Sequence, residues 1–114
     1  SRVMGTMLRF RCGCGFDAKA PLGAGMQSFT TVCAAPFTCR ACQTVVSINL
    51  YAASRACPTC GGPAEAMFDL VEEQWPAGYA WRFGSQSVVV KRPPLPCPRC
   101  LGPTLAIEPA YNFD

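Results

Sequence analysis

The amino-acid sequence predicts a small, mostly β protein whose loops are held by cysteine clusters. Three observations support this fold class. The chain has 114 residues, of which nine are cysteine and none is histidine. Leu, Ile, Val and Phe together make up only 24 of the 114 residues, so hydrophobic burial alone would barely offset the chain entropy. Eleven prolines and ten glycines interrupt any long helix and leave short, β-branched segments between them.

The first third of the chain predicts two strands separated by a loop. Residues 6–11 show a weak alternation of polar and apolar side chains and lead into a cysteine, so they predict a strand. Residues 20–25 (APLGAG) have the composition of a loop, and residues 27–32 (QSFTTV) have that of a strand. We expect Pro36 to interrupt regular structure after this second strand.

The rest of the chain predicts four more short strands. Residues 43–51 (QTVVSINLY) give the clearest strand prediction of the sequence. Residues 64–71 suit a strand or a short helix, and the neighbouring cysteine pairs favour the strand. Residues 87–90 (SVVV) and 104–107 predict two further strands, whereas residues 92–98 (RPPLPCP) predict a stiff, extended segment.

Eight of the nine cysteines lie in four close pairs. The pairs are Cys12 with Cys14, Cys39 with Cys42, Cys57 with Cys60, and Cys97 with Cys100. An odd number of cysteines cannot all form disulfides within one chain. Close pairs without a secretory signal are typical of metal ligands, so we expect a cytoplasmic, metal-binding protein. No segment is apolar for long enough to predict a membrane span.

Residues 57–61 (CPTCG) have the features of a knuckle, a tight turn that presents two cysteines to one ion. The proline sets φ for the turn, and the glycine accepts the positive φ that closes it. Zn²⁺ prefers four thiolates in a tetrahedron. Fourteen residues separate the pair Cys39 and Cys42 from Cys57, which is close to the usual spacing. We therefore predict a first zinc site at Cys39, Cys42, Cys57 and Cys60.

An internal repeat indicates a second metal site. Residues 57–66 recur as residues 97–106 with six identical positions, which indicates that these two knuckles belong to different sites. In a nested pairing, the two central knuckles share one ion and the two outer knuckles share the other. In a crossed pairing, the first knuckle (Cys12 and Cys14) shares an ion with the third (Cys57 and Cys60), and the second (Cys39 and Cys42) shares one with the fourth (Cys97 and Cys100). We favour the nested pairing because the short central connection costs the least loop entropy. The second site is then formed by Cys12, Cys14, Cys97 and Cys100.

The cysteine motifs are FRCGCGF at 10–16, CRAC at 39–42, CPTCGG at 57–62 and CPRCLG at 97–102. Together with GAGM at 23–26, they resemble small bacterial zinc-ribbon proteins of the rubredoxin-like, multi-CxxC class, whose function is uncharacterised. The resemblance implies two zinc ribbons with short antiparallel strands and Gly/Pro-rich loops, and almost nothing about biochemical role. The chain departs from the pattern at its first knuckle, which is CxC, and at Leu101, which replaces a glycine and strains its turn.

We expect residues 1–114 to form a single compact unit of two ribbons. The central ribbon is predicted over residues 37–66. The second site joins residues 7–16 to residues 93–108, and residues 72–92 form an aromatic insert between them.

We expect the ninth cysteine, Cys33, to be a buried strand residue, because cysteine is among the most buried residue types. The alternatives are a substitute ligand for the irregular first knuckle and a reactive thiol. Since the sequence contains no histidine to activate a nucleophile, we expect no enzymatic activity.

The segment WPAGYAWRF at 75–83 concentrates aromatic residues. The segment could anchor a protein partner or stack on nucleic-acid bases. Alternatively, it supplies hydrophobic core between the two ribbons. The predicted partner-binding residues are Trp75, Tyr79, Trp81, Phe83 and Arg99.

Arginines lie beside the knuckles at positions 9, 11, 40, 55 and 99. They predict either a phosphate-binding face or neutralisation of anionic metal centres, and we favour neutralisation. Because a zinc ion with four thiolates carries about −2, two filled sites change the formal net charge from +3 to about −1. Only 15% of residues are charged, which favours an apolar surface that meets a partner.

The sequence thus predicts a zinc-binding, non-catalytic interaction module or small adaptor subunit, with two Zn²⁺ ions and no small-molecule substrate. It is expected to dock on a protein partner or to self-associate. The alternatives are a nucleic-acid-binding zinc ribbon and a rubredoxin-like electron carrier that holds iron.

Overall fold

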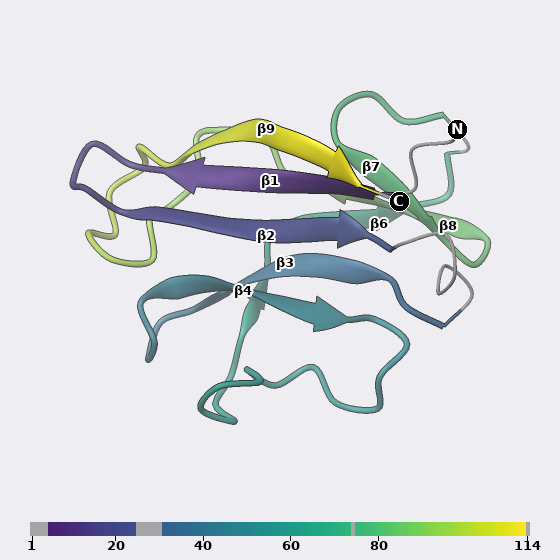
Figure 1. The fold of residues 1–114 in the computed structure, drawn as a ribbon, viewed down its shortest axis with the longest axis horizontal. Helices are drawn as coiled ribbons and strands as arrows, with labels where there is room; N and C mark the ends of the chain where they lie inside the picture. Colours follow the sequence, from purple (N-terminus) through teal and green to yellow (C-terminus); the bar gives the residue numbers. More distant parts are fainter. Residues whose placement is uncertain (1–4, 25–30, 74, 114) are drawn as a thin grey trace.

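The computed structural model describes residues 5–24, 31–73 and 75–113, and within these ranges every regular element is a strand. The strands form two antiparallel sheets (Figure 1). This confirms the predicted small, mostly β fold class. Over the described ranges, the chain has no helix with the length and apolar character that a bilayer crossing requires.

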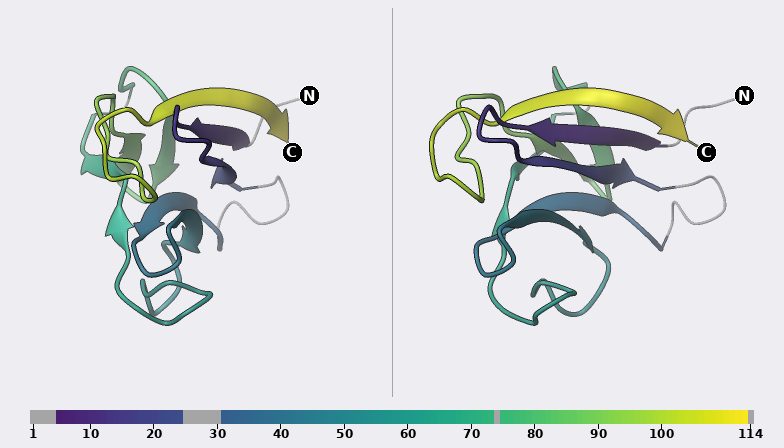
Figure 2. Two further views of the ribbon diagram at one scale, coloured as in Figure 1. Left: turned by 90° about the vertical axis from the view of Figure 1, so that its left-hand side faces the viewer. Right: turned by 60° about the vertical axis from the view of Figure 1, so that its left-hand side comes forward.

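The larger sheet has six strands in the order β4-β3-β2-β1-β9, with β5 paired to β3. They are β1 (Gly5–Arg11), β2 (Asp17–Gly23), β3 (Ala34–Cys39), β4 (Thr44–Asn49), β5 (Glu65–Ala66) and β9 (Ala106–Phe113). β1 pairs along its length with β2 and β9, and β3 pairs along its length with β4. β2 meets β3 only where Gly23 lies opposite Ala34. The sheet therefore consists of two halves joined at one point (Figure 2).

The smaller sheet has three strands in the order β6-β8-β7. They are β6 (Phe68–Val71), β7 (Ala80–Phe83) and β8 (Gln86–Val90). Both sheets contribute to one core. In it the rings of Phe68 and Phe37 pack edge to face, with their centroids 5.3 Å apart. Fully buried side chains from both sheets include Leu8, Phe10, Leu22 and Val88.

Four of the strand predictions are confirmed. Residues 6–11 lie in β1, residues 43–51 contain β4, and residues 87–90 lie in β8. Residues 64–71 contain β5 and β6, so the strand was the right choice over a helix. The strand predicted over residues 27–32 falls largely outside the described residues, and Thr31 and Val32 lie in no strand.

Two predicted interruptions are wrong. Residues 20–23 were expected in a loop, but they complete β2, because β1 offers a full-length partner and Ala20 and Leu22 are buried. Pro36 lies inside β3 opposite Ser47. Its C=O accepts a hydrogen bond from the N–H of Met67, on the side away from β4. Its missing N–H points to that same side, so no bond between β3 and β4 is lost.

Two further strands differ from the sequence-based expectation. β9 begins two residues later than the predicted segment 104–107 and runs to Phe113, because it pairs with β1 from Arg11 back to Gly5. β7 lies in the part of the aromatic insert before residues 87–90, where no strand was expected. It forms by antiparallel pairing with β8 around a turn at Gly84.

Gly23 lies where the two halves of the larger sheet meet, and the smaller sheet packs on it at the same point. Its φ is +96°, and a Cβ built on it would lie 2.6 Å from Cδ2 of Trp81 in β7. The Trp81 indole therefore packs directly on the backbone at the bridge to Ala34. Only glycine accommodates both the backbone conformation and this contact.

We predict that Gly23→Ala costs about 3 kcal/mol of unfolding free energy, because it combines a positive φ with overlap against the Trp81 ring. The matched control is Gly78→Ala. Gly78 has a φ of +93° but no atom near its would-be Cβ, so the control should cost only about 1 kcal/mol. Urea unfolding of the metal-loaded variants measures both. Equal losses in the two variants would show that the Trp81 contact does not constrain residue 23.

Candidate metal centres

The first cysteine group lies where the β3–β4 turn meets the connection between β4 and β5. Cys39 ends β3 and Cys42 lies in the turn, whereas Cys57 and Cys60 come from the connection. The four Sγ atoms all lie within 4.8 Å of one another. The Sγ of Cys39 is 3.6 Å from that of Cys60, and the Sγ of Cys42 is 3.9 Å from that of Cys57.

The second group joins the tip of the β1–β2 hairpin to the connection between β8 and β9, which lie together at one end of the molecule (Figures 1 and 2). Cys12 and Cys14 come from the hairpin, and Cys97 and Cys100 from the connection. Their Sγ atoms also lie within 4.8 Å of one another. The Sγ of Cys12 is 3.6 Å from that of Cys100, and that of Cys14 is 3.8 Å from that of Cys97. The structure therefore brings the knuckles together in the nested arrangement.

The sulfur distances fit a tetrahedral metal ion. Four sulfurs at about 2.3 Å from a central ion lie about 3.8 Å from one another. The four Sγ–Sγ distances given above run from 3.6 to 3.9 Å, and no pair within a group is more than 4.8 Å apart. All nine cysteines are free thiols, and these separations far exceed the roughly 2.05 Å of a disulfide. Each group could thus hold one metal ion, and the same sulfur geometry suits zinc and iron.

All four knuckles share one backbone feature. The residue directly after the second cysteine has a positive φ in each case: Gly15 at +100°, Gln43 at +53°, Gly61 at +73° and Leu101 at +64°. Glycine adopts this conformation freely, but Gln43 and Leu101 are strained there. The strain at Leu101 was expected from the sequence, whereas that at Gln43 was not.

The repeated knuckles are also equivalent in their hydrogen bonds. The N–H of Gly61 donates to the C=O of Cys57 at 2.8 Å, and the N–H of Leu101 donates to the C=O of Cys97 at 2.9 Å. The N–H of each first cysteine donates to the C=O of a glycine five residues later, at 2.9 Å in both knuckles. The CxC knuckle reaches a similar turn through a bond from the N–H of Gly15 to the C=O of Cys12 at 3.0 Å.

Backbone N–H groups point at the sulfurs of both groups. Three such contacts measure 3.4 Å each: Cys42 N–H to Cys39 Sγ, Gly62 N–H to Cys60 Sγ, and Arg99 N–H to Cys97 Sγ. Donors at this position stabilise thiolates over thiols and orient them toward an ion.

The thiols of the first group differ in acidity. The N–H groups of Cys60 and Thr59 lower the pKa of the Cys57 thiol to about 6. The neighbouring Cys39 and Cys60 sulfurs, by contrast, raise the pKa of the Cys42 thiol to about 12. The group therefore offers one ready thiolate, but four thiolates cannot coexist at neutral pH unless a cation compensates their charge.

Thr104 is a site residue that sequence reasoning missed. Its Oγ1 lies 3.0 Å from the Sγ of Cys12. The N–H of Cys14, followed by the Thr104 hydroxyl, lowers the pKa of the Cys12 thiol to about 6. Thr104 replaces the Ala64 of the other repeat, and this difference between the repeats is the one sequence signal that marks it.

The two groups differ in exposure. In the first group Cys39 and Cys57 are buried and only Cys60 is exposed. In the second group only Cys97 is buried, and both Cys14 and Cys100 are exposed. Chelators and water therefore reach the second group more easily.

Cys33 belongs to neither group. Its side chain is fully buried just before β3, and its N–H donates to Oδ1 of Asn49 at 2.9 Å. Burial raises the pKa of its thiol to about 11, so it remains protonated and inert at neutral pH.

The arginines beside the knuckles have partners within the chain. Arg9 pairs with Asp17 and Glu108, and Arg11 pairs with Glu108 at 3.1 Å. The remaining contacts are Arg40 to Glu65 at 3.6 Å, Arg55 to the C=O of Leu50 at 3.2 Å, and Arg99 over the ring of Phe16 at 5.7 Å. These guanidinium groups are thus directed to carboxylates, a carbonyl and a ring of their own chain.

The predicted partner-binding aromatic residues fall into two classes. Tyr79, Trp81 and Phe83 are half-buried and pack against the core. The ring of Phe83 also contacts that of Tyr51, with centroids 4.9 Å apart and ring planes tilted by 57°. Trp75, in contrast, is 92% exposed. The segment therefore supplies core and leaves one large aromatic residue on the surface.

Comparisons of the chain with protein-family models, with curated proteins and with solved structures find no match.

We predict that Cys57→Ser and Cys97→Ser each bind one metal ion per chain, because a serine oxygen is a poor substitute for a thiolate at a soft ion. The matched control Cys33→Ser removes a thiol outside both groups and should retain two ions. Native mass spectrometry counts the ions directly. Retention of two ions by Cys97→Ser would show that the outer cysteines are not ligands.

We also predict that a chelator removes the metal of the second group before that of the first. The Cys57→Ser and Cys97→Ser variants, which each keep one group intact, assign the two kinetic phases. Leu101→Gly should slow release from the second group roughly fivefold, since it relieves about 1 kcal/mol of backbone strain. Gln43→Gly is the matched control and should slow only the first group. Faster release from the first group would contradict the role of exposure.

Proposed function

We propose that this chain is a zinc-binding, non-catalytic interaction module that docks on a protein partner as a small adaptor subunit. The observation that carries the proposal is the pair of four-cysteine groups, each with the sulfur spacing of a tetrahedral site. Four protein ligands close the coordination sphere, which is the arrangement of structural metal sites.

Zinc is the ion that we favour at both groups. Cys39, Cys42, Cys57 and Cys60 would hold the first ion, and Cys12, Cys14, Cys97 and Cys100 the second. Each ion would supply a cross-link between loops and the positive charge that four thiolates need. A cytoplasmic location fits these groups, because a reducing compartment keeps thiols available for metal.

The non-catalytic part of the proposal rests on the chemistry left after the two groups are assigned. All eight paired cysteines belong to closed four-ligand groups. The sequence has no histidine, and the remaining thiol of Cys33 is buried and protonated. These features leave little that could act as a nucleophile or general base.

A protein partner suits this surface better than nucleic acid. A phosphate backbone is bound by clusters of free Lys and Arg. Here Arg9, Arg11 and Arg40 already pair with carboxylates, and two filled zinc sites would bring the net charge to about −1. The 92% exposed indole of Trp75 is instead typical of an anchor that a partner protein covers.

Affinity capture tests this proposal. The zinc-loaded chain, immobilised and exposed to extract of its own host, should retain a defined protein at stoichiometric amounts, and nuclease treatment should not release it. Trp75→Ala should abolish retention, whereas the matched control Tyr111→Ala, which removes another exposed aromatic side chain on β9, should not. Retention of nucleic acid at low salt, or a red iron-loaded chain without a protein partner, would favour one of the alternative functions.

A further inference from the structure

The outer edge of β7 has unpaired backbone groups. β7 lies at the edge of its sheet and pairs only with β8. The C=O of Tyr79 accepts a hydrogen bond from the N–H of Val90, directly opposite. Because hydrogen-bonded pairs alternate along an antiparallel ladder, Trp81 also bonds to β8, whereas the N–H and C=O of Ala80 and Arg82 point outward. Within the described residues, no strand pairs with these outward groups.

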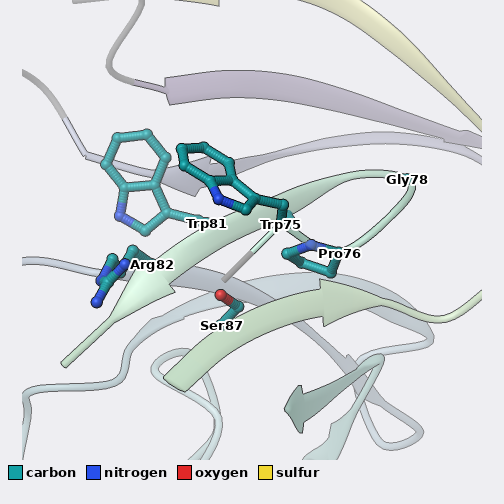
Figure 3. A pocket seen from close by; sticks show the side chains of 7 residues that line it. Trp75, Pro76, Gly78, Trp81, Arg82 and Ser87 are labelled. Carbon is teal, nitrogen blue, oxygen red and sulfur yellow. The ribbon is translucent and has the colours of Figure 1, made fainter. Parts of the chain in front are cut away.

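A groove of ≈ 410 Å³ runs beside this edge. It is lined by residues 80–82 of β7 and Ser87 of β8, together with Trp75, Pro76 and Gly78 of the preceding loop (Figure 3). Successive side chains of a strand point to opposite faces of its sheet. In the register of β7 with β8, Arg82 lies opposite Ser87, so Ala80, Arg82 and Ser87 share one face of the smaller sheet, and the groove lies over that face beside the free edge. A segment added at the β7 edge would therefore place every second side chain on the face that holds the groove.

The groove has a distinct chemistry. The indoles of Trp75 and Trp81 form its apolar part, and the guanidinium of Arg82 lies beside them (Figure 3). Arg82 is exposed and donates through Nε to the C=O of Gly84 at 3.4 Å. Among the ion pairs of the described residues, none includes Arg82, in contrast to Arg9, Arg11 and Arg40. An acidic side chain would complement this cation.

The long edge strand β9 is less suited to strand addition. It contains Pro109, which has no N–H to donate, and its register with β1 shifts between Met7 and Leu8. Proline and irregular register are devices that protect an edge from pairing. A second copy of the chain is also a poor occupant of the β7 edge, because antiparallel pairing of two β7 strands would place both Arg82 side chains on the same face of the joined sheet, where like charges repel.

We propose that β7 receives an extended, acidic segment of a protein partner, which adds to the smaller sheet as a fourth strand. The backbone of the segment bonds to Ala80 and Arg82, one carboxylate meets the Arg82 guanidinium, and an apolar side chain lies against Trp75. This inference rests on the proposed interaction-module function and specifies how the partner is recognised.

Selection of a phage-displayed library of random linear peptides on the zinc-loaded chain tests the inference. We expect enrichment of sequences that alternate apolar and acidic residues. A synthetic copy of the most enriched peptide should bind at least about tenfold more weakly to Arg82→Glu, and selection on that variant should now enrich basic peptides. The matched control Lys19→Glu makes the same charge change at an exposed position of β2 and should leave affinity within about twofold.

Ala80→Pro tests strand addition separately from charge. It removes an N–H that points away from β8, so the sheet and the metal content should be retained while peptide affinity falls about fivefold. Trp75→Ala, a surface change, gives a second test of the same groove. Enrichment of basic or proline-rich peptides, or full affinity in Arg82→Glu and Trp75→Ala, would overturn the inference. If capture of a nuclease-resistant protein partner then persisted, the interaction-module proposal would still stand.

Discussion

The structure depends on two clusters of four cysteine sulfurs, each assembled from segments that are apart in the sequence. Sulfurs 3.6 to 3.9 Å apart are stable as thiolates only around a cation, as the opposite pKa shifts of Cys57 and Cys42 indicate. The second group joins Cys12 to Cys100 across 88 positions of sequence. A cross-link of that span offsets much chain entropy in a protein with few large aliphatic residues.

Each cysteine group lies at one half of the larger sheet. The first is built on the β3–β4 turn, and the second on the β1–β2 hairpin and the segment that enters β9. The halves meet through the single bridge between Gly23 and Ala34, where the Trp81 indole of the smaller sheet packs on the backbone. Both halves also contribute to the shared hydrophobic core, so the two cysteine groups are attached to one packed unit. The same segment that supplies the Trp81 contact also presents the exposed Trp75 and the free edge of β7.

Sequence reasoning reached the cysteine grouping because ligand spacing and the repeated knuckle are local features of the chain. Strands such as β4 and β8 were predictable for the same reason, since their β-branched runs are short and continuous. The errors concern long-range pairing. Pairing with β1 keeps residues 20–23 in β2 and extends β9 to Phe113. Pro36 fits in β3 only because its missing N–H faces away from β4. Thr104 and the positive φ of Gln43 likewise depend on the folded arrangement of the knuckles.

X-ray absorption at the zinc edge of the purified, metal-loaded chain tests the central claim most directly, because it reports the ligands of the bound ions themselves. Two closed four-cysteine groups predict four sulfur neighbours for each ion, at about 2.3 Å, with no nitrogen or oxygen in the coordination sphere. A mixed sulfur and oxygen environment, or fewer than four sulfurs per ion, would contradict the claim that both groups are closed structural metal centres.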